Sequence, residues 1–432
     1  MKSLVKIVLC LSLVFNYPLS TFHLNAQDTV RRTFDSWLSD AYGHSTTVLA
    51  ATLQRQAAAA ALEQARWNFT PTLAASAGAD MAFFRGTTTT NTSYGAGASW
   101  TLFDGLNNIN TLRSSKAEQL RSDIGVEKSR HDVAVQIVNT YLEILANQER
   151  QQYLADLNAS ARKQAEDAEA RYNAGRLLES DYLLLKANWK RAESDMNNAA
   201  FAIENGLLRL RHLIGLGDSV ALAVVPMDTD SAQLAGDDWT LTPEAIDSLP
   251  EMKMSQLELE KARYQLKMAK GAHMPQLGLN AYASYYGGDH VRTDAGGMLV
   301  TSGGINTTLS LGLSVPILNR GYIRMQVKQA RLGIQQAELQ MQHMRDEMEQ
   351  TLSERQRALQ QARNTLEACQ IMQQATQASL KTYQAKYQAG TVTATELLQQ
   401  EERCLSALND YLQSKYTYII SELILRIYLG KI

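Results

Sequence analysis

Residues 171–184 read RYNAGRLLESDYLL, and residues 386–399 read KYQAGTVTATELLQ. Each stretch has a basic residue, a tyrosine, the pair Ala-Gly and an acid six residues after the glycine. The two copies are 215 residues apart in a chain of 432 residues. A repeat at half-chain spacing predicts that the fold itself is duplicated.

Further matches extend the repeat along the chain. TPTL at 70–73 matches MPQL at 274–277, SWTLFDG at 99–105 matches SVPILNRG at 314–321, and LLRLRHLIG at 207–215 matches ELILRIYLG at 422–430. We therefore predict a first structural repeat at 27–215 and a second at 245–432. The segment 216–244 between them is rich in Asp, Gly and Ser, which indicates a linker with short elements, an equatorial segment of the fold.

The first residues have the pattern of an export signal. Lys2 and Lys6 flank an apolar stretch that runs to Phe15, and Ala26 offers a small residue for cleavage. This pattern is typical of a secretory signal peptide, which we assign to residues 1–26.

Composition narrows the class of protein. The 42 Lys and Arg residues nearly balance 44 Asp and Glu residues, which argues against a nucleic-acid partner. Cys369 lies 21 residues before Gly390 and Cys404 lies 14 after it. If Gly390 is a hairpin tip, the two thiols are offset by about 10 Å along the hairpin, so we expect no disulfide between them.

Both repeats carry the same order of secondary-structure signals. The predicted elements are helices at 45–69 and 245–273, strand pairs at 72–85 and 92–103 and at 276–286 and 304–316, proline-free long helices at 106–172 and 322–388, and return helices at 177–212 and 393–429. Apolar residues in the second long helix are spaced alternately by 4 and 3 positions: Ile323, Val327, Ala330, Ile334, Ala337, Met341, Met344 and Met348. This spacing predicts one narrow coiled-coil seam. The glycine-rich run between the last two strands is expected to be a flexible loop.

The strands alternate apolar and polar residues, so each has one face of each kind. An apolar outer face and a polar lumen are typical of a transmembrane barrel, although a soluble sandwich with one buried face has the same alternation. The strands are longer than the 9–11 residues, roughly, that cross a membrane. A membrane barrel needs at least about eight strands, and open edges in lipid leave backbone groups unpaired. In the membrane interpretation, the chain must therefore oligomerise.

The motifs SWTLFDG, LSLGLSVPILNRG, LPEMKMSQLELEKARYQLKMAKGAHMP and both Tyr-x-Ala-Gly turns resemble the TolC-type outer-membrane efflux protein family. The resemblance covers essentially the whole mature chain. It implies a mainly α fold with a transmembrane β part: a homotrimer whose long helical hairpins form a periplasmic α-barrel and whose strands complete a shared twelve-stranded β-barrel.

The resemblance also implies a function. The expected protein is the exit duct of a tripartite efflux or type I secretion system, in the outer membrane of a Gram-negative bacterium with most of its mass in the periplasm. Its expected partners are a periplasmic adaptor (membrane fusion) protein, an inner-membrane transporter and outer-membrane lipid. A structural or adhesive coiled-coil surface protein without a channel remains the alternative.

The resemblance places a pore gate at the hairpin tips, on Asp181 and Glu396. Carboxylates from several copies near one axis would attract cations and repel anions. Thr393 and Glu396 also form a capping-box sequence, so local helix capping is the alternative for Glu396. Asp181 at a helix start is likewise favourable for local reasons. Gln399 occupies a position where the family often has a further acid.

The remaining candidate residues surround the same tips. By resemblance, the adaptor contacts are Ala174, Gly175, Arg176, Ala389, Gly390 and Thr391, and the closed-state packing residues are Tyr172 and Tyr387. The glycines also suit a turn with positive φ, and the tyrosines suit plain packing in the seam.

Residue patterns for catalysis or cofactors are missing from the sequence. It has no phosphate-binding G-x-x-x-x-G-K motif, and its seven histidines show no metal-ligand spacing. We therefore predict a passive conduit, with no cofactor, no metal site and no enzymatic activity.

Overall fold

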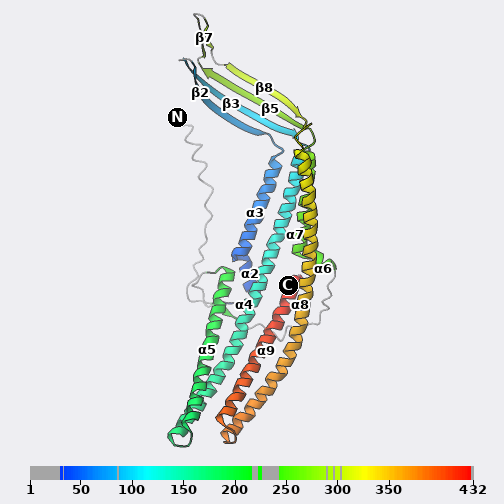
Figure 1. The fold of residues 1–432 in the computed structure, drawn as a ribbon. Helices are drawn as coiled ribbons and strands as arrows, with labels where there is room; N and C mark the ends of the chain where they lie inside the picture. The colour runs from blue at the N-terminus through cyan, green and yellow to red at the C-terminus, as the bar shows by residue number, and fades with distance from the viewer. Residues whose placement is uncertain are drawn as a thin grey trace.

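The structure is a computed structural model that describes residues 30–32, 34–84, 87–216, 222–225, 243–288, 290–294, 297–301 and 304–429. The predicted signal peptide and most of the linker at 216–244 lie outside these residues. The described chain is elongated, with a β-sheet at one end and two helical turns at the other (Figure 1). The mainly α fold class with a four-stranded sheet is confirmed.

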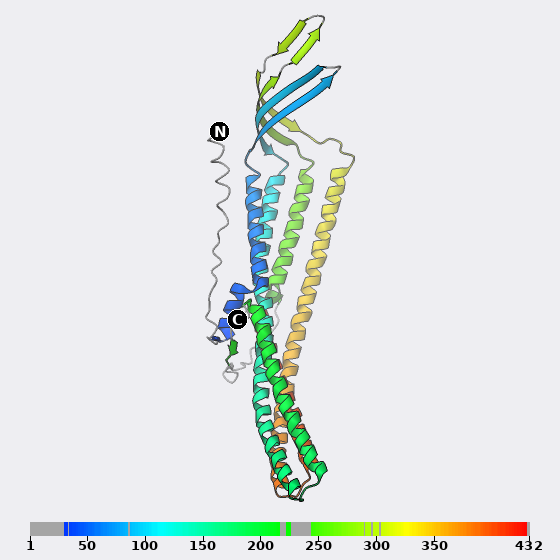
Figure 2. The ribbon, with the colours of Figure 1, turned by 90° about the vertical axis from the view of Figure 1, so that its left-hand side faces the viewer.

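Two very long helices run along most of the molecule. They are α4, Asn107–Asn173, and α8, Tyr322–Gln388, and each has 67 residues. In the half near the sheet, α3 (Thr46–Trp67) and α7 (Pro250–Gly271) complete a layer in the order α3, α4, α7, α8 (Figure 2). In the other half, α5 (Glu179–Ile214) packs on α4 and α9 (Ala394–Tyr428) packs on α8, with α4 and α9 in contact. Among the described residues, no helix is apolar enough over a sufficient length to cross a membrane.

Of the short elements at mid-length, only those of the linker were predicted, without their positions. The strand β1, Val30–Arg32, pairs in parallel with β4, Leu222–Val224, and α2 spans Phe34–His44. Where the sequence predicts one helix at 245–273, the structure has α6, Pro243–Ser248, followed by α7. The break is at Leu249, whose ψ of 144° is extended, because a residue before proline disfavours the helical conformation.

The largest apolar core lies at this mid-length. Trp37 from α2, Ile137 and Tyr141 from α4, and Leu210 from α5 are fully or almost fully buried in it, and Tyr416 and Ile427 of α9 join them. The predicted seam of α8 is also confirmed. Its Ala337 packs with Leu259 and Ala262 of α7, and Met348 lies in a second cluster with Met252.

The main sheet is antiparallel in the order β2-β3-β5-β8. Its strands are β2, Thr72–Phe84; β3, Thr87–Phe103; β5, Gln276–Gly288; and β8, Gly304–Ser314. The register pairs apolar residues with one another, such as Leu277 with Leu313 and Tyr94 with Tyr285. One face of the sheet is therefore mainly apolar, and its side chains, such as Leu73 and Ile305, are exposed in the single chain.

A small hairpin extends beyond this sheet. It consists of β6, His290–Asp294, and β7, Gly297–Thr301, in antiparallel pairing. The sequence predicted only a flexible loop here. The pairing places His290, Val291, Arg292 and Thr293 opposite Met298, Leu299 and Val300, and a segment of this composition can form strands. The glycines around it favoured the prediction of a loop.

The sheet joins the helices through a contact between two glycine backbones. A Cβ atom at Gly271, where α7 ends, would lie 2.2 Å from the carbonyl oxygen of Gly105. A Cβ at Gly105 would lie 2.2 Å from the carbonyl oxygen of Gly271, and Gly105 also has a φ of +70°. Only glycine allows the two repeats to approach this closely at the base of the sheet.

We expect Gly271→Ala to lower stability by about 1–3 kcal/mol, because backbone atoms must shift to admit the methyl group. Thermal unfolding followed by circular dichroism in detergent measures the effect. Gly125→Ala in α4 is the matched control, since its Cβ would meet no atom within 4 Å. The control should be neutral or stabilising by up to about 1 kcal/mol. Equal melting temperatures for the two variants would contradict this account of the junction.

Candidate functional site

The tip between α4 and α5 is a glycine turn. Gly175 has a φ of +69°, and its N–H donates to the Tyr172 carbonyl oxygen at 2.8 Å. The N–H of Arg176 donates to the Arg171 carbonyl oxygen at 2.8 Å. These two bonds satisfy carbonyl groups at the helix end and require a left-handed residue, which explains the glycine.

The tip between α8 and α9 repeats this geometry. Gly390 has a φ of +73°, and its N–H donates to Tyr387 at 3.0 Å, while Thr391 N–H donates to Lys386 at 3.0 Å. The repeated sequence motif is therefore a repeated backbone turn. At both tips the predicted contact residues Ala174, Arg176, Ala389 and Thr391 are exposed.

Glu396 closes the predicted capping box at the start of α9. The Thr393 N–H donates to its Oε2 at 2.8 Å, and the Glu396 N–H donates to Thr393 Oγ1 at 3.3 Å. Bonds from the Thr393 backbone and hydroxyl lower the pKa of Glu396, although its carboxyl group is exposed. Helix capping at Glu396 is thus confirmed, whatever further role this acid has.

Asp181 has a different environment. No side chain caps α5, whose N-cap residue is Leu178, and the carboxylate of Asp181 has no hydrogen bond or ion pair within the described part of the chain. It lies close to Tyr387 of the other hairpin. Burial raises the pKa of the Tyr387 phenol, Arg171 lowers it, and the carboxylates of Asp181 and Asp167 raise it further. The Asp181 carboxylate is therefore near enough to the other hairpin to act on the Tyr387 phenol.

The two tip tyrosines make different contacts. Tyr172 stacks on Tyr182 of its own hairpin, with ring centroids 5.4 Å apart and an interplanar angle of 6°. Tyr387 instead packs between hairpins, against the cluster of Ala168, Leu185 and Ala394. Tyr387 thus contributes to joining the hairpins, whereas Tyr172 braces one of them.

One buried polar residue near the tips was not singled out from the sequence. Glu401 of α9 is buried and bonds to residues of both α4 and α5. The signal was present, because Glu401 stands in a 4-3-4 series with the buried residues Leu397, Cys404 and Leu408. A carboxylate in an apolar seam indicates a specific partner on the facing helices.

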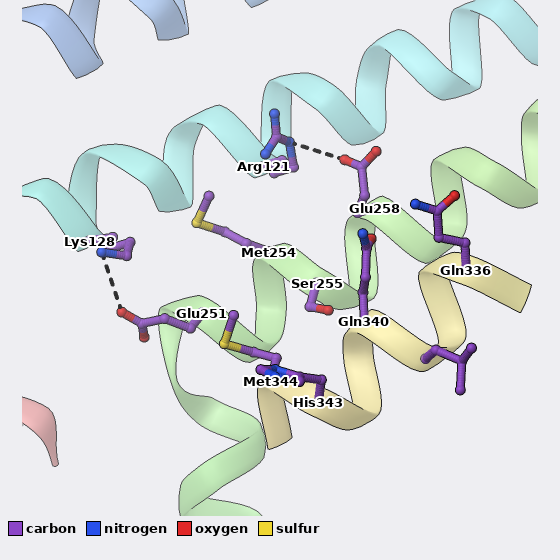
Figure 3. Close-up of a pocket in the computed structure, with 11 residues that line it drawn as sticks. Arg121, Lys128, Glu251, Met254, Ser255, Glu258, Gln336, Gln340, His343 and Met344 are labelled. Atoms are coloured by element: carbon purple, nitrogen blue, oxygen red, sulfur yellow. Dashed lines mark ion pairs between the residues drawn. The ribbon is translucent and has the colours of Figure 1, made fainter. Parts of the chain in front are cut away.

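A groove nearer the sheet is a second candidate. It has a volume of about 590 Å³ and lies between α4, α7 and α8, with Met254 and Met344 in its lining (Figure 3). Its charges pair with each other: Arg121 with Glu258 at 3.5 Å, and Lys128 with Glu251 at 3.8 Å. These pairs join the two repeats. Within the described ranges, no cluster of His, Cys, Asp or Glu could hold a metal ion.

Comparison with known proteins decides the family. The sequence model described as outer membrane efflux protein matches residues 37–216 and 241–431. The chain belongs to this family. The predicted resemblance to TolC-type outer-membrane efflux proteins is confirmed, and the protein is accordingly an outer-membrane protein.

Two curated relatives have low sequence identity to this chain. The outer membrane protein TolC of Escherichia coli (strain K12) is 24% identical over 314 residues, and that of Salmonella enteritidis is 23% identical over 315 residues. Each match covers 71% of this chain but only 63% of the relative. The aligned region thus spans less than two thirds of either TolC.

Two solved structures share the fold. The structure of CusC, which was solved to describe folding and transmembrane channel formation, superposes on this chain with a TM-score of 0.78 at 18% identity. The superposition covers 97% of this chain and 95% of CusC. The Campylobacter jejuni CmeC outer membrane channel gives 0.76 at 18% identity, over 92% of this chain and 85% of CmeC. At such identities the likeness concerns the fold alone.

The capping box gives a pH-dependent prediction. Because the folded-state pKa of Glu396 is lowered, its stabilising contribution is present above the ordinary pKa of 4.5 and is lost as pH falls through the folded value. Thr393→Val should cost about 1 kcal/mol at neutral pH, and less in acid. Thermal unfolding at several pH values tests this. Thr395→Val, which removes an exposed hydroxyl outside the cap, should show no such dependence; a pH-independent cost in Thr393→Val would contradict the capping role.

Proposed function

We propose that the protein is the exit duct of a tripartite efflux or type I secretion system and that it works as a homotrimer. Substrate would pass from a periplasmic adaptor and an inner-membrane transporter through the tube to the exterior. The observation that carries the proposal is that every layer of the single chain ends in two unpartnered edges. A second copy of the chain, placed head to tail, supplies what each edge lacks.

The sheet provides the clearest pair of edges. The outer sides of β2 and β8 have no strand partner in the described structure, while the apolar face is exposed. In lipid, unpaired backbone N–H and C=O groups cost several kcal/mol each. Pairing β8 of one copy with β2 of the next removes this cost, and such a ring closes as a barrel.

The helical layers carry matching edges. Met325, Leu332 and Leu339 of α8 are one heptad apart and exposed, and they lie outside the cluster in which Ala337 packs on α7. We call these three residues the α8 edge stripe. At the other edge of the same layer, α3 exposes Leu49 and Leu53. The α8 edge stripe and the α3 leucines can bury each other between neighbouring copies.

The half near the tips follows the same rule. Its outer helices are α5, which exposes Phe201 and Leu208, and α8, which exposes Ile371 and Met372. The same rotation from one copy to the next would therefore close the sheet and both helical layers into rings. At each interface, an edge element of the first repeat in one copy meets an edge element of the second repeat in the next copy. Closed rings of this kind are the usual outcome of head-to-tail interfaces.

The proposed gate lies at the hairpin tips. Asp181 and Glu396 of three copies would surround the axis at the periplasmic end and favour cations there. Tyr387, between the hairpins, would help to hold the closed arrangement, with Tyr172 bracing its own hairpin. The exposed turn residues, Ala174 to Arg176 and Ala389 to Thr391, would meet the adaptor. No step of this transport requires a cofactor or an enzymatic reaction by this chain.

The edge contacts predict the effect of a single substitution. We expect Leu332→Asp to abolish the trimer, because it places a carboxylate in an apolar interface. Size-exclusion chromatography with light scattering in detergent measures the oligomeric state. Arg331→Asp is the control, since this position is turned by about 100° around α8 from Leu332. A trimer that persists in Leu332→Asp would contradict the proposed interface.

The gate predicts electrical behaviour. In planar bilayers the purified trimer should conduct ions poorly at rest and be blocked by multivalent cations added on the tip side. Asp181→Asn with Glu396→Gln should weaken this block and alter the conductance, because the anionic ring is removed. Asp410→Asn, on the exposed flank of α9, should leave both unchanged. A protein without any channel activity would favour a structural coiled-coil role instead.

A further inference from the structure

Glu401 joins the two hairpins through three helices. Its side chain comes from α9, and only 4% of the residue is exposed. Its Oε1 accepts a hydrogen bond from Gln164 Nε2 of α4 at 2.9 Å, and its Oε2 accepts one from Asn188 Nδ2 of α5 at 3.1 Å. One carboxyl group of the second hairpin is thus bonded to both helices of the first.

The partners of Glu401 are neutral amides. In the described structure no Lys, Arg or His pairs with this carboxyl group. Arg191 of α5, which lines the same cavity, is instead 3.0 Å from Glu402. The other ionisable groups facing the site are Asp195 of α5 and, from α4, Tyr153, whose hydroxyl contacts the Cys404 thiol of α9 at 3.3 Å. None of them supplies a positive charge.

Burial without a cation favours the neutral form of the carboxyl group. Desolvation raises the pKa of Glu401 above the ordinary value of 4.5, and the two amide bonds only partly oppose it. If the hairpins separate, water reaches the group and its pKa returns towards the ordinary value. The joined arrangement therefore binds a proton more tightly than the separated one.

Two details of the site support this. Gln164 Oε1 is buried without a hydrogen bond, so a protonated Glu401 could donate to it after rotation of the amide. A cavity of about 300 Å³ between α4, α5 and α9 adjoins Glu401 and gives room for water beside an ionised group. The site can thus offer an acceptor to the neutral carboxyl group after this rotation, and it can admit water to the ionised group.

We propose that Glu401 is a proton-sensitive tie that positions the two hairpins of each chain, holding them together more firmly when protonated than when ionised. The consequence for gating rests on the proposed function, in which the tips must separate for the channel to open. Acidification then favours the closed channel. Between pH 4.5 and the raised pKa, each unit of pH changes the ratio of closed to open states by up to about tenfold.

The test compares Glu401→Gln with Asp410→Asn, which removes an exposed carboxylate of α9 that has no ion pair in the described structure. Glutamine keeps the shape of the neutral acid, so Glu401→Gln should stay closed at all pH values, with a low open probability that does not vary with pH. The wild type and Asp410→Asn should open more often as pH rises. A Gln164→Lys variant places an ammonium group beside the carboxylate, stabilises the ionised form of the joined hairpins and should weaken the dependence of opening on pH. Equal pH profiles for the wild type and Glu401→Gln would overturn the proposal.

Thermal unfolding of the trimer at each pH separates this inference from the channel itself. Because the folded-state pKa of Glu401 is raised, its stabilising contribution is full below pH 4.5 and is lost as pH rises through the folded value. Glu401→Gln should therefore match the wild type in acid and melt higher at neutral pH. If the protein shows this result but conducts no ions, the role of Glu401 is supported and the proposed channel function is contradicted. Identical melting profiles for the wild type and Glu401→Gln would contradict the role of Glu401 even if the channel conducts.

Discussion

Unpaired strand edges are the constraint on which the rest of the molecule depends. A four-stranded sheet with one mainly apolar face has no stable place as a single copy, either in water or in lipid. The helices have the same incompleteness, since each layer buries a seam on one side and leaves an apolar stripe at its margin. Duplication of the chain makes these margins complementary, because a first-repeat element is always at one edge and α8 or β8 at the other.

The internal joints of the chain are of a different kind. The two repeats meet through backbone at Gly105 and Gly271, through ion pairs such as Arg121 with Glu258, and through the mid-length core around Tyr141. Near the tips the apolar contacts become smaller, and polar bonds such as those of Glu401 join the hairpins. Firm packing at the centre and polar contacts at the tips favour motion at the tips, because small polar interfaces open at lower free energy than large apolar ones.

Periodicity allowed most of the fold to be predicted. The long helices, the heptad seam of α8 and the alternating strands follow from local spacing, and so does the Thr393 capping box. The elements β1 and α2 could not be predicted this way, and β4 only as an unplaced short element of the linker, because their stability comes from the core around Trp37 rather than from a pattern of their own. At the tips, the motif predicted the turns. It did not predict that Asp181 approaches Tyr387, or that Glu401 bonds to Gln164, since both contacts depend on how one hairpin lies against the other.

The two tips share a backbone but differ in side chains. Both turns have the same left-handed glycine and the same pair of hydrogen bonds, while only the second has a capped helix behind it. In the proposed trimer, a partner that recognises the turn backbone would meet twice as many equivalent positions as the tube has chains. A partner that recognises the side chain of Arg176 or of Thr391 would meet only one such position in each chain. The duplication therefore allows a partner to bind the ring of tips with either two copies or one copy per chain. Which of these occurs depends on whether the partner recognises the turn backbone or a side chain.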